Sequence, residues 1–185
     1  MLQDLLYKIK IKAVHGSTDV KIESVQTDSR AVEKGGCFIA VKGAVADGHN
    51  FINTAIEKGA KAIIAEHLPA SLQPGITYIE TDNSAAAAGI AAHNFYGSPS
   101  LNMNLVGVTG TNGKTTVATL LFKLFTNFGY KCGLISTIEN KIADEVIPST
   151  HTTPDAVHLN ALLGKMHYAG CKYVFMECSS HAIEQ

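Results

Sequence analysis

The chain has 185 residues, of which 46% are apolar and 17% are charged, with 15 basic and 16 acidic side chains. This apolar fraction supports a hydrophobic core, and the length fits one domain or two small ones. The formal net charge of −1 excludes a globally basic surface of the kind that binds nucleic acid or anionic membranes. No stretch approaches the ~20 apolar residues of a membrane span. We therefore expect no nucleic-acid partner and no membrane insertion.

The four cysteines form no C-x-x-C pair; they are Cys37, Cys132, Cys171 and Cys178. The sequence therefore indicates neither a zinc ribbon nor a disulfide framework. Free thiols fit a reducing compartment, and the N-terminus has no signal-peptide pattern. We expect a cytoplasmic protein.

The first half of the chain alternates helix-like and strand-like segments. Turn residues separate them, with Gly59 ending a helix and Asp82, Asn83 or Ser84 offering a cap for the next. In chain order, we expect an amphipathic segment at 2–11, a strand at 37–41, a helix from about 51, strands at 62–65 and 76–79, and a helix to about Tyr96.

A cluster of breakers at 97–100, Gly-Ser-Pro-Ser, predicts a short linker. We expect one domain at 1–98 and a second at 99–185. In the second, we expect strands at 105–108, 130–135 and 172–176, with helices at 114–128 and 154–169. Strands alternating with helices indicate an α/β fold with a parallel sheet covered by helices.

In such sheets, ligands bind beyond the carboxyl ends of the strands. The residues that follow Val108, Ile135 and Met176 are therefore the candidates for chemistry.

The strongest local signal is the glycine-rich segment 107–116, which follows a strand and opens a helix. Such a loop turns backbone N–H groups toward a phosphate, and the helix N-terminus adds partial positive charge. We expect Lys114 to reach the β- and γ-phosphates of a nucleotide and the Thr115 hydroxyl to bind Mg²⁺. Val108 stands where the strict phosphate-loop pattern has its first glycine, so this loop is a subtype. The structural alternative is a glycine-rich turn with an exposed lysine.

A GTPase is disfavoured, because the segment 140–143, Asn-Lys-Ile-Ala, lacks the aspartate of an N-K-x-D guanine reader. No D-x-x-G follows the loop either.

Several motifs together resemble the Mur ligases, and among them the MurE type. The segment 110–116 is similar to the family's ATP loop, and 27–30, 36–40 and 47–49 look like its UDP-sugar domain. The segments 152–154 and 176–181 distinguish the MurE type, because its Ser-Ser-His follows a glutamate at a strand end. The resemblance covers essentially the whole chain. It implies a small α/β UDP-binding domain followed by the first part of a P-loop ATPase domain with a parallel sheet.

The resemblance implies site residues as well. ATP would contact Gly110, Thr111, Asn112, Gly113, Lys114, Thr115 and Thr116. Glu177 would join Lys114 in catalysis and Thr115 in holding Mg²⁺. The substrate UDP-MurNAc-L-Ala-D-Glu would contact Ser29, Thr152, Thr153, Ser179 and Gln185. For isolated residues the structural readings stay open: a capped turn at 28–30, and a helix cap at Thr153 before Pro154.

The implied activity is ATP-dependent amide formation, through an acyl phosphate, that adds a diamino acid as the third residue of the peptidoglycan stem peptide. The resemblance suggests no obligate protein partner. It also implies that these 185 residues are the N-terminal part of a longer enzyme and do not ligate alone. Two alternatives stay open: the related ligase that adds D-Ala-D-Ala at the fourth step, and a nucleotide-binding module that performs no chemistry.

Overall fold

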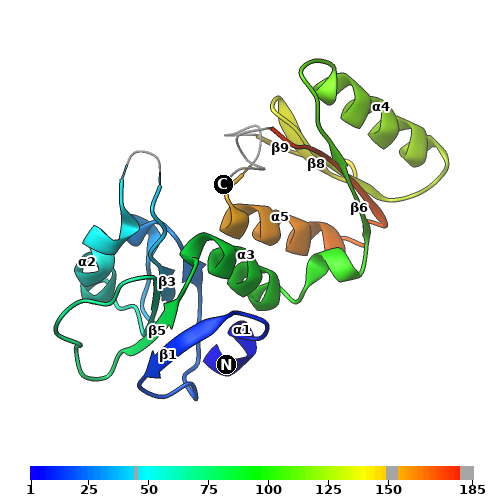
Figure 1. Ribbon diagram of the computed structural model, residues 1–185. Coiled ribbons are helices and arrows are strands. Elements are labelled where there is room, and N and C mark those ends of the chain that lie inside the picture. The colour runs from blue at the N-terminus through cyan, green and yellow to red at the C-terminus, as the bar shows by residue number, and fades with distance from the viewer. Residues whose placement is uncertain (44–45, 149–153, 180–185) are drawn as a thin grey trace. The chain divides into compact units, whose positions relative to one another are not determined.

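Figure 1 shows the computed structural model, which describes residues 1–43, 46–148 and 154–179. The chain forms two compact units, Met1–Phe95 and Tyr96–Gln185. The breakers at 97–100 follow this division directly, and Pro99–Leu101 form a short 3-10 turn, η3. Each unit has its own sheet. No described helix is long and apolar enough to cross a lipid bilayer.

Unit 1 contains a five-stranded sheet in the order β1-β5-β4-β3-β2. Its strands are β1 (Ile11–His15), β2 (Val25–Gln26), β3 (Cys37–Ile39), β4 (Ala62–Ala65) and β5 (Thr77–Thr81). The strands β2, β3, β4 and β5 are parallel to one another, and β1 pairs antiparallel with β5 at the edge of the sheet. The predicted amphipathic segment at 2–11 is only partly helical, because α1 covers Leu2–Leu5. The sequence prediction also missed β1 and β2.

Helices cover both faces of the unit 1 sheet (Figure 1). A 3-10 turn, η2 (Gly48–Phe51), leads into α2 (Ile52–Glu57), whose Ile52 and Ala55 pack in a cluster with Phe38, Ile63 and Tyr78. On the other face, α3 (Ser84–Phe95) buries four alanines, Ala87, Ala88, Ala91 and Ala92. Its cap is Asn83, whose Oδ1 accepts the Ala86 N–H at 2.8 Å. Small side chains let this helix lie close to the sheet.

Unit 2 contains a second five-stranded sheet, in the order β6-β10-β7-β8-β9. Three strands are parallel, as the sequence predicts: β6 (Asn104–Val108), β10 (Tyr173–Glu177) and β7 (Cys132–Ile135). The sequence prediction missed the antiparallel hairpin formed by β8 (Glu139–Ile142) and β9 (Glu145–Pro148). The sheet is therefore mixed rather than purely parallel.

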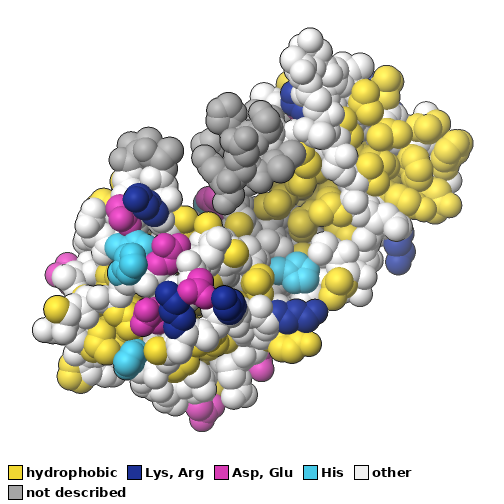
Figure 2. Space-filling view, viewed as in Figure 1, with side chains coloured by type: hydrophobic (Ala, Val, Ile, Leu, Met, Phe, Trp, Pro, Cys, Tyr) yellow, Lys and Arg dark blue, Asp and Glu magenta, His cyan; other side chains and the backbone are white. Residues whose placement is uncertain are grey.

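One helix covers each face of the unit 2 sheet. The first, α4 (Lys114–Asn127), packs Ala118 and Phe122 against Leu134 and Phe175. The second, α5 (Ala156–Tyr168), packs Leu163 and Met166 in a cluster with Ile135 and Val174. Figure 2 shows hydrophobic side chains gathered over α4; the exposed large hydrophobic residues of α4 are Val117, Leu120 and Leu124, and Phe128 follows directly after the helix.

Candidate functional site

The carboxyl ends of the three parallel strands meet at one edge of the unit 2 sheet. In the register, Glu177 of β10 lies beside Val108 of β6, and Met176 lies beside Ile135 of β7. The Cys178 N–H also donates to the Val108 carbonyl at 2.9 Å. The residues that follow each strand are therefore neighbours, as the sequence predicts, and β10 stands between the other two.

The segment 109–113 joins β6 to α4 and lies exposed beyond this edge. Gly110 has a φ of +143° and Gly113, the residue before α4, has a φ of +79°. A side chain at either position would be strained, so glycine permits the tight turn. The loop therefore opens a 14-residue helix whose first N–H groups lack intrahelical partners and suit an anion.

The Lys114 ammonium group folds back over this loop. Its Nζ donates to the Gly110 carbonyl at 2.7 Å and lies 3.5 Å from the Thr111 carbonyl. Because a lysine ammonium has three donors, these contacts hold the charge at the loop while leaving capacity for a phosphate. Gly107, in β6, is required for space rather than for backbone conformation, because a Cβ there would lie 3.0 Å from Cys178 Sγ.

Glu177 ends β10 with only 1% of its surface exposed. Thr137 holds both carboxylate oxygens: its backbone N–H donates to Oε1 and its Oγ1 donates to Oε2, each at 3.1 Å. Thr137 was absent from the predicted site residues. The available signal was its position, two residues after β7 ends at Ile135.

The described residues contain no group of three or more His, Cys, Asp or Glu side chains that could hold a metal ion by itself. A cation at this edge would depend on ligands such as the Thr115 hydroxyl, the Glu177 carboxylate, phosphate oxygens and water. Mg²⁺ commonly binds in this way, through one or two protein oxygens and substrate phosphates. The donor set therefore fits a magnesium–nucleotide complex.

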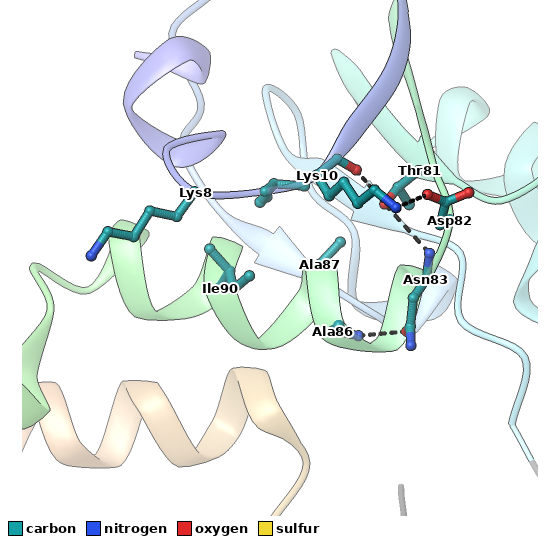
Figure 3. A pocket seen from close by; sticks show the side chains of 9 residues that line it. Lys8, Lys10, Thr81, Asp82, Asn83, Ala86, Ala87 and Ile90 are labelled. Atoms are coloured by element: carbon teal, nitrogen blue, oxygen red, sulfur yellow. Dashed lines mark hydrogen bonds and ion pairs between the residues drawn. The ribbon is translucent and has the colours of Figure 1, made fainter.

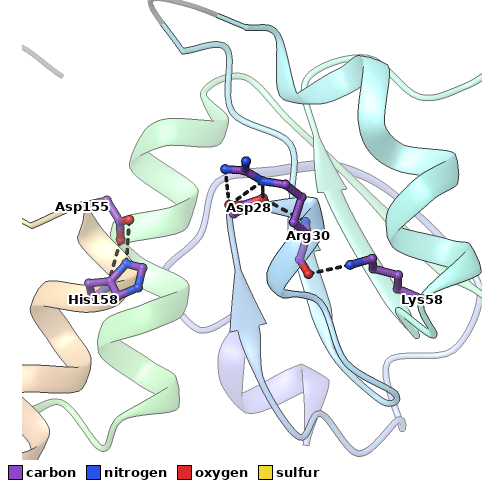
Figure 4. A network of polar contacts seen from close by, with 5 residues as sticks. All are labelled: Asp28, Arg30, Lys58, Asp155 and His158. Atoms are coloured by element: carbon purple, nitrogen blue, oxygen red, sulfur yellow. Dashed lines mark hydrogen bonds and ion pairs between the residues drawn. The ribbon is translucent and has the colours of Figure 1, made fainter.

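In unit 1, Ser29 is 6% exposed and begins a 3-10 turn, η1 (Ser29–Ala31). Its neighbours Asp28 and Arg30 form the capped turn that the sequence analysis gave as the structural alternative for 28–30. Asp28 Oδ1 accepts the Arg30 N–H at 2.8 Å, and the Arg30 guanidinium bonds both carboxylate oxygens (Figure 4). The side-chain bond from Arg30, followed by its backbone bond, lowers the pKa of Asp28. Lys58 donates to the Arg30 carbonyl at 2.6 Å.

A second turn in unit 1 is built on Asp47, whose Oδ1 accepts the His49 N–H at 3.0 Å and lies 2.6 Å from His49 Nδ1. These bonds lower the pKa of Asp47, the backbone bond most. The Gly43 N–H donates to the Ala46 carbonyl and the Gly48 N–H to the Val41 carbonyl, each at 2.9 Å. These two backbone bonds link the residues before and after the segment 44–45.

The other predicted site residues are only partly described. Ser179 is half-buried, two residues beyond Glu177. Thr152, Thr153 and Gln185 lie outside the described residues. The cap of α5 is Asp155 rather than Thr153, because Asp155 Oδ1 accepts the His158 N–H at 2.9 Å (Figure 4).

A cavity of about 190 Å³ lies in unit 1 between the segment 8–10 and the start of α3 (Figure 3). Lys10 and Lys12 pair with Asp82 beside it, at 2.8 and 2.9 Å. None of the predicted site residues that the structure describes lines it; its described lining consists of Lys8, Ile9, Lys10, Thr81, Asp82, Asn83, Ala86, Ala87 and Ile90.

The chain matches two family models, "Mur ligase family, catalytic domain" over 21–117 and "Mur ligase middle domain" over 108–185. It is 55% identical over 184 residues to UDP-N-acetylmuramoyl-L-alanyl-D-glutamate–2,6-diaminopimelate ligase of Bacteroides fragilis, and 54% identical over 185 residues to the Cytophaga hutchinsonii ligase of that name. Each match covers 100% of this chain and 38% of the relative. The chain therefore spans well under half the length of these curated relatives.

Solved structures give the same result. A ligase of that name superposes with a TM-score of 0.78 and 26% identity, covering 99% of this chain and 36% of that chain. MurF ligase of Thermotoga maritima, in complex with ADP, superposes with a TM-score of 0.60 and 25% identity, covering 88% and 33%. With a family model matched over more than half of its residues, the chain belongs to the Mur ligase family.

Proposed function

We propose that the full-length protein joins 2,6-diaminopimelate to UDP-MurNAc-L-Ala-D-Glu at the expense of ATP. The observation that carries this proposal is that the glycine-rich loop after Val108 begins beside the buried Glu177. The chain that holds this arrangement is 55% identical to a UDP-N-acetylmuramoyl-L-alanyl-D-glutamate–2,6-diaminopimelate ligase. The identity extends over all of the chain, which supports the MurE type over the D-Ala-D-Ala-adding type. We place the reaction in the cytoplasm, where the four free cysteines would stay reduced.

The two units would divide the work. Unit 1 would hold the UDP end of the substrate near Ser29, and unit 2 would hold ATP on the segment 110–116. The muramoyl peptide would contact Thr152, Thr153, Ser179 and Gln185. This division rests on the family resemblance and on the positions of the described residues.

In the proposed reaction, a carboxylate oxygen of the substrate attacks the γ-phosphorus and ADP leaves, which forms an acyl phosphate. The amine of the amino acid then attacks the acyl carbon, loses a proton, and expels phosphate. Two anions must approach in the first step, so Lys114 and the loop N–H groups would offset their repulsion. Mg²⁺, held by Thr115 and Glu177, would neutralise charge on the phosphate oxygens.

The test is an assay of the full-length protein with ATP, UDP-MurNAc-L-Ala-D-Glu and 2,6-diaminopimelate. We expect phosphate release to require all three compounds and mass spectrometry to find the amide product. Parallel reactions with lysine in place of diaminopimelate, and with D-Ala-D-Ala and the tripeptide substrate, separate the related ligases. Phosphate release without any amide product would contradict the proposal.

A further inference from the structure

Thr137 lies in the turn between β7 and β8, and Glu177 ends β10, 40 residues away in sequence. They meet at the edge of the sheet that carries the phosphate loop. Thr137 is exposed, whereas Glu177 is 1% exposed. One exposed residue thus gives a donor to each oxygen of a buried carboxylate, through its N–H and its hydroxyl. Two bonds to two oxygens fix both the position of the carboxylate and its rotation.

The turn that presents these donors is itself braced. The Ser136 N–H donates to Oδ1 of Asn140 at 3.2 Å, and the Ser136 hydroxyl donates to the Glu139 carbonyl at 2.7 Å. Ser136 and Asn140 are both buried, at 1% and 7% exposure. Asn140 belongs to β8, so the hairpin β8–β9 anchors the turn. Asn140, which begins the segment that lacks the aspartate of a guanine-binding motif, therefore supports the turn that carries Thr137.

We propose that Thr137 is the positioning residue for Glu177, and that the turn at 136–138, braced by β8, orients this carboxylate for the cation that accompanies the nucleotide. A carboxylate that accepts hydrogen bonds can also ligate a metal, because each of its oxygens has two lone-pair sites. Residues that hydrogen-bond a metal ligand commonly set metal affinity, and their loss weakens binding about 10- to 100-fold. This inference rests on the proposed function, in which Glu177 holds Mg²⁺.

The experiment measures Mn²⁺ affinity by electron paramagnetic resonance in the full-length protein, with a non-hydrolysable ATP analogue bound. Thr137→Val and Thr137→Ala remove the hydroxyl from an exposed position, and Thr137→Ser keeps it. Thr126→Val is the matched control, because it too removes the hydroxyl of an exposed threonine, here one that donates to the Phe122 carbonyl at 2.8 Å. Glu177→Gln tests the metal ligand itself.

We expect Thr137→Val and Thr137→Ala to weaken Mn²⁺ binding about tenfold or more, while Thr137→Ser and Thr126→Val stay near wild type. In the ligation assay, the valine variant should need more Mg²⁺ for half-maximal rate at an unchanged KM for the UDP-linked substrate. Wild-type Mn²⁺ affinity in both Thr137→Val and Thr137→Ala, with weak binding in Glu177→Gln, would overturn the inference alone. Wild-type affinity in Glu177→Gln would overturn the metal role in the proposed function as well.

Discussion

The backbone N–H of Glu66 donates a hydrogen bond to Nε2 of His49 at 3.0 Å. Because Nε2 accepts this bond, the proton of the neutral imidazole lies on Nδ1, which is 2.6 Å from Asp47 Oδ1. The Glu66 carboxylate in turn accepts the Ser84 N–H and hydroxyl at the start of α3. His49 therefore ties the turn at Asp47 to Glu66, the residue after β4, whose side chain bonds the start of α3.

Replacing His49 with alanine should destabilise the protein by about 1–3 kcal/mol, because it leaves the Glu66 N–H without its acceptor. His67 is the control: it is exposed, and its ring lies 5.7 Å from that of His49. His67→Ala should change the free energy of unfolding by less than about 0.5 kcal/mol. Urea denaturation of the full-length protein measures both, and equal losses would contradict the assigned role of His49.

Glu66 should make part of the stability depend on pH. The Ser84 backbone bond, followed by the Ser84 hydroxyl, lowers the pKa of Glu66 below its ordinary value of 4.5. A lowered pKa in the folded state gives stability that is present above the ordinary pKa and is lost as pH falls through the lowered value. Glu66→Gln should therefore be less stable than wild type near neutral pH, by about 0.3–1 kcal/mol.

Thermal unfolding at about pH 7 and again below about pH 3 checks this prediction. The gap between wild type and Glu66→Gln should close at the acid end, where both side chains are uncharged. Glu33→Gln, at an exposed position, should show no such gap. A constant difference at both pH values would mean that the Glu66 charge does not stabilise α3.

Two glycines of unit 1 should respond oppositely to alanine. A Cβ on Gly48 would lie 2.7 Å from the Val41 carbonyl oxygen and 2.8 Å from its nitrogen, and backbone atoms cannot yield. Gly48→Ala should cost about 1–3 kcal/mol and weaken binding of UDP-MurNAc-L-Ala-D-Glu. A Cβ on Gly89, inside α3, would meet no atom within 4 Å apart from its chain neighbours and the helix's own nearby backbone, so Gly89→Ala should stabilise the helix by up to about 1 kcal/mol. Calorimetry that ranks the two variants in the reverse order would contradict this packing.

The buried strands of both sheets were predictable, because β4 and β7 are short apolar runs in which every residue is buried. The apolar pattern does not predict strands that form through backbone pairing with a neighbouring strand rather than through burial of their side chains. In β1 only Ala13 is partly buried and the other four residues are exposed, so the strand has no alternation of buried and exposed side chains that a sequence pattern could indicate. The hairpin β8–β9 turns through Ala143, whose φ of +52° is unusual for a residue with a side chain.

The candidate site divides in the same way. The spacing of Gly110, Gly113 and Lys114 reflects local backbone geometry, so the loop could be predicted from the sequence. The bonds from Thr137 to Glu177 depend on the strand order, which places β10 beside β7. No local pattern encodes that order, so Thr137 was missed, although it lies just after β7, where the sequence analysis expected chemistry.

The central claim is that the segment 110–116 binds the phosphates of ATP, and calorimetric titration of the full-length protein with a non-hydrolysable ATP analogue and Mg²⁺ tests it most directly. Lys114→Ala should weaken binding about 10- to 100-fold, the value of a charge-assisted hydrogen bond. Lys123→Ala, on an exposed position of α4, should bind like wild type. Wild-type affinity in Lys114→Ala would contradict the account.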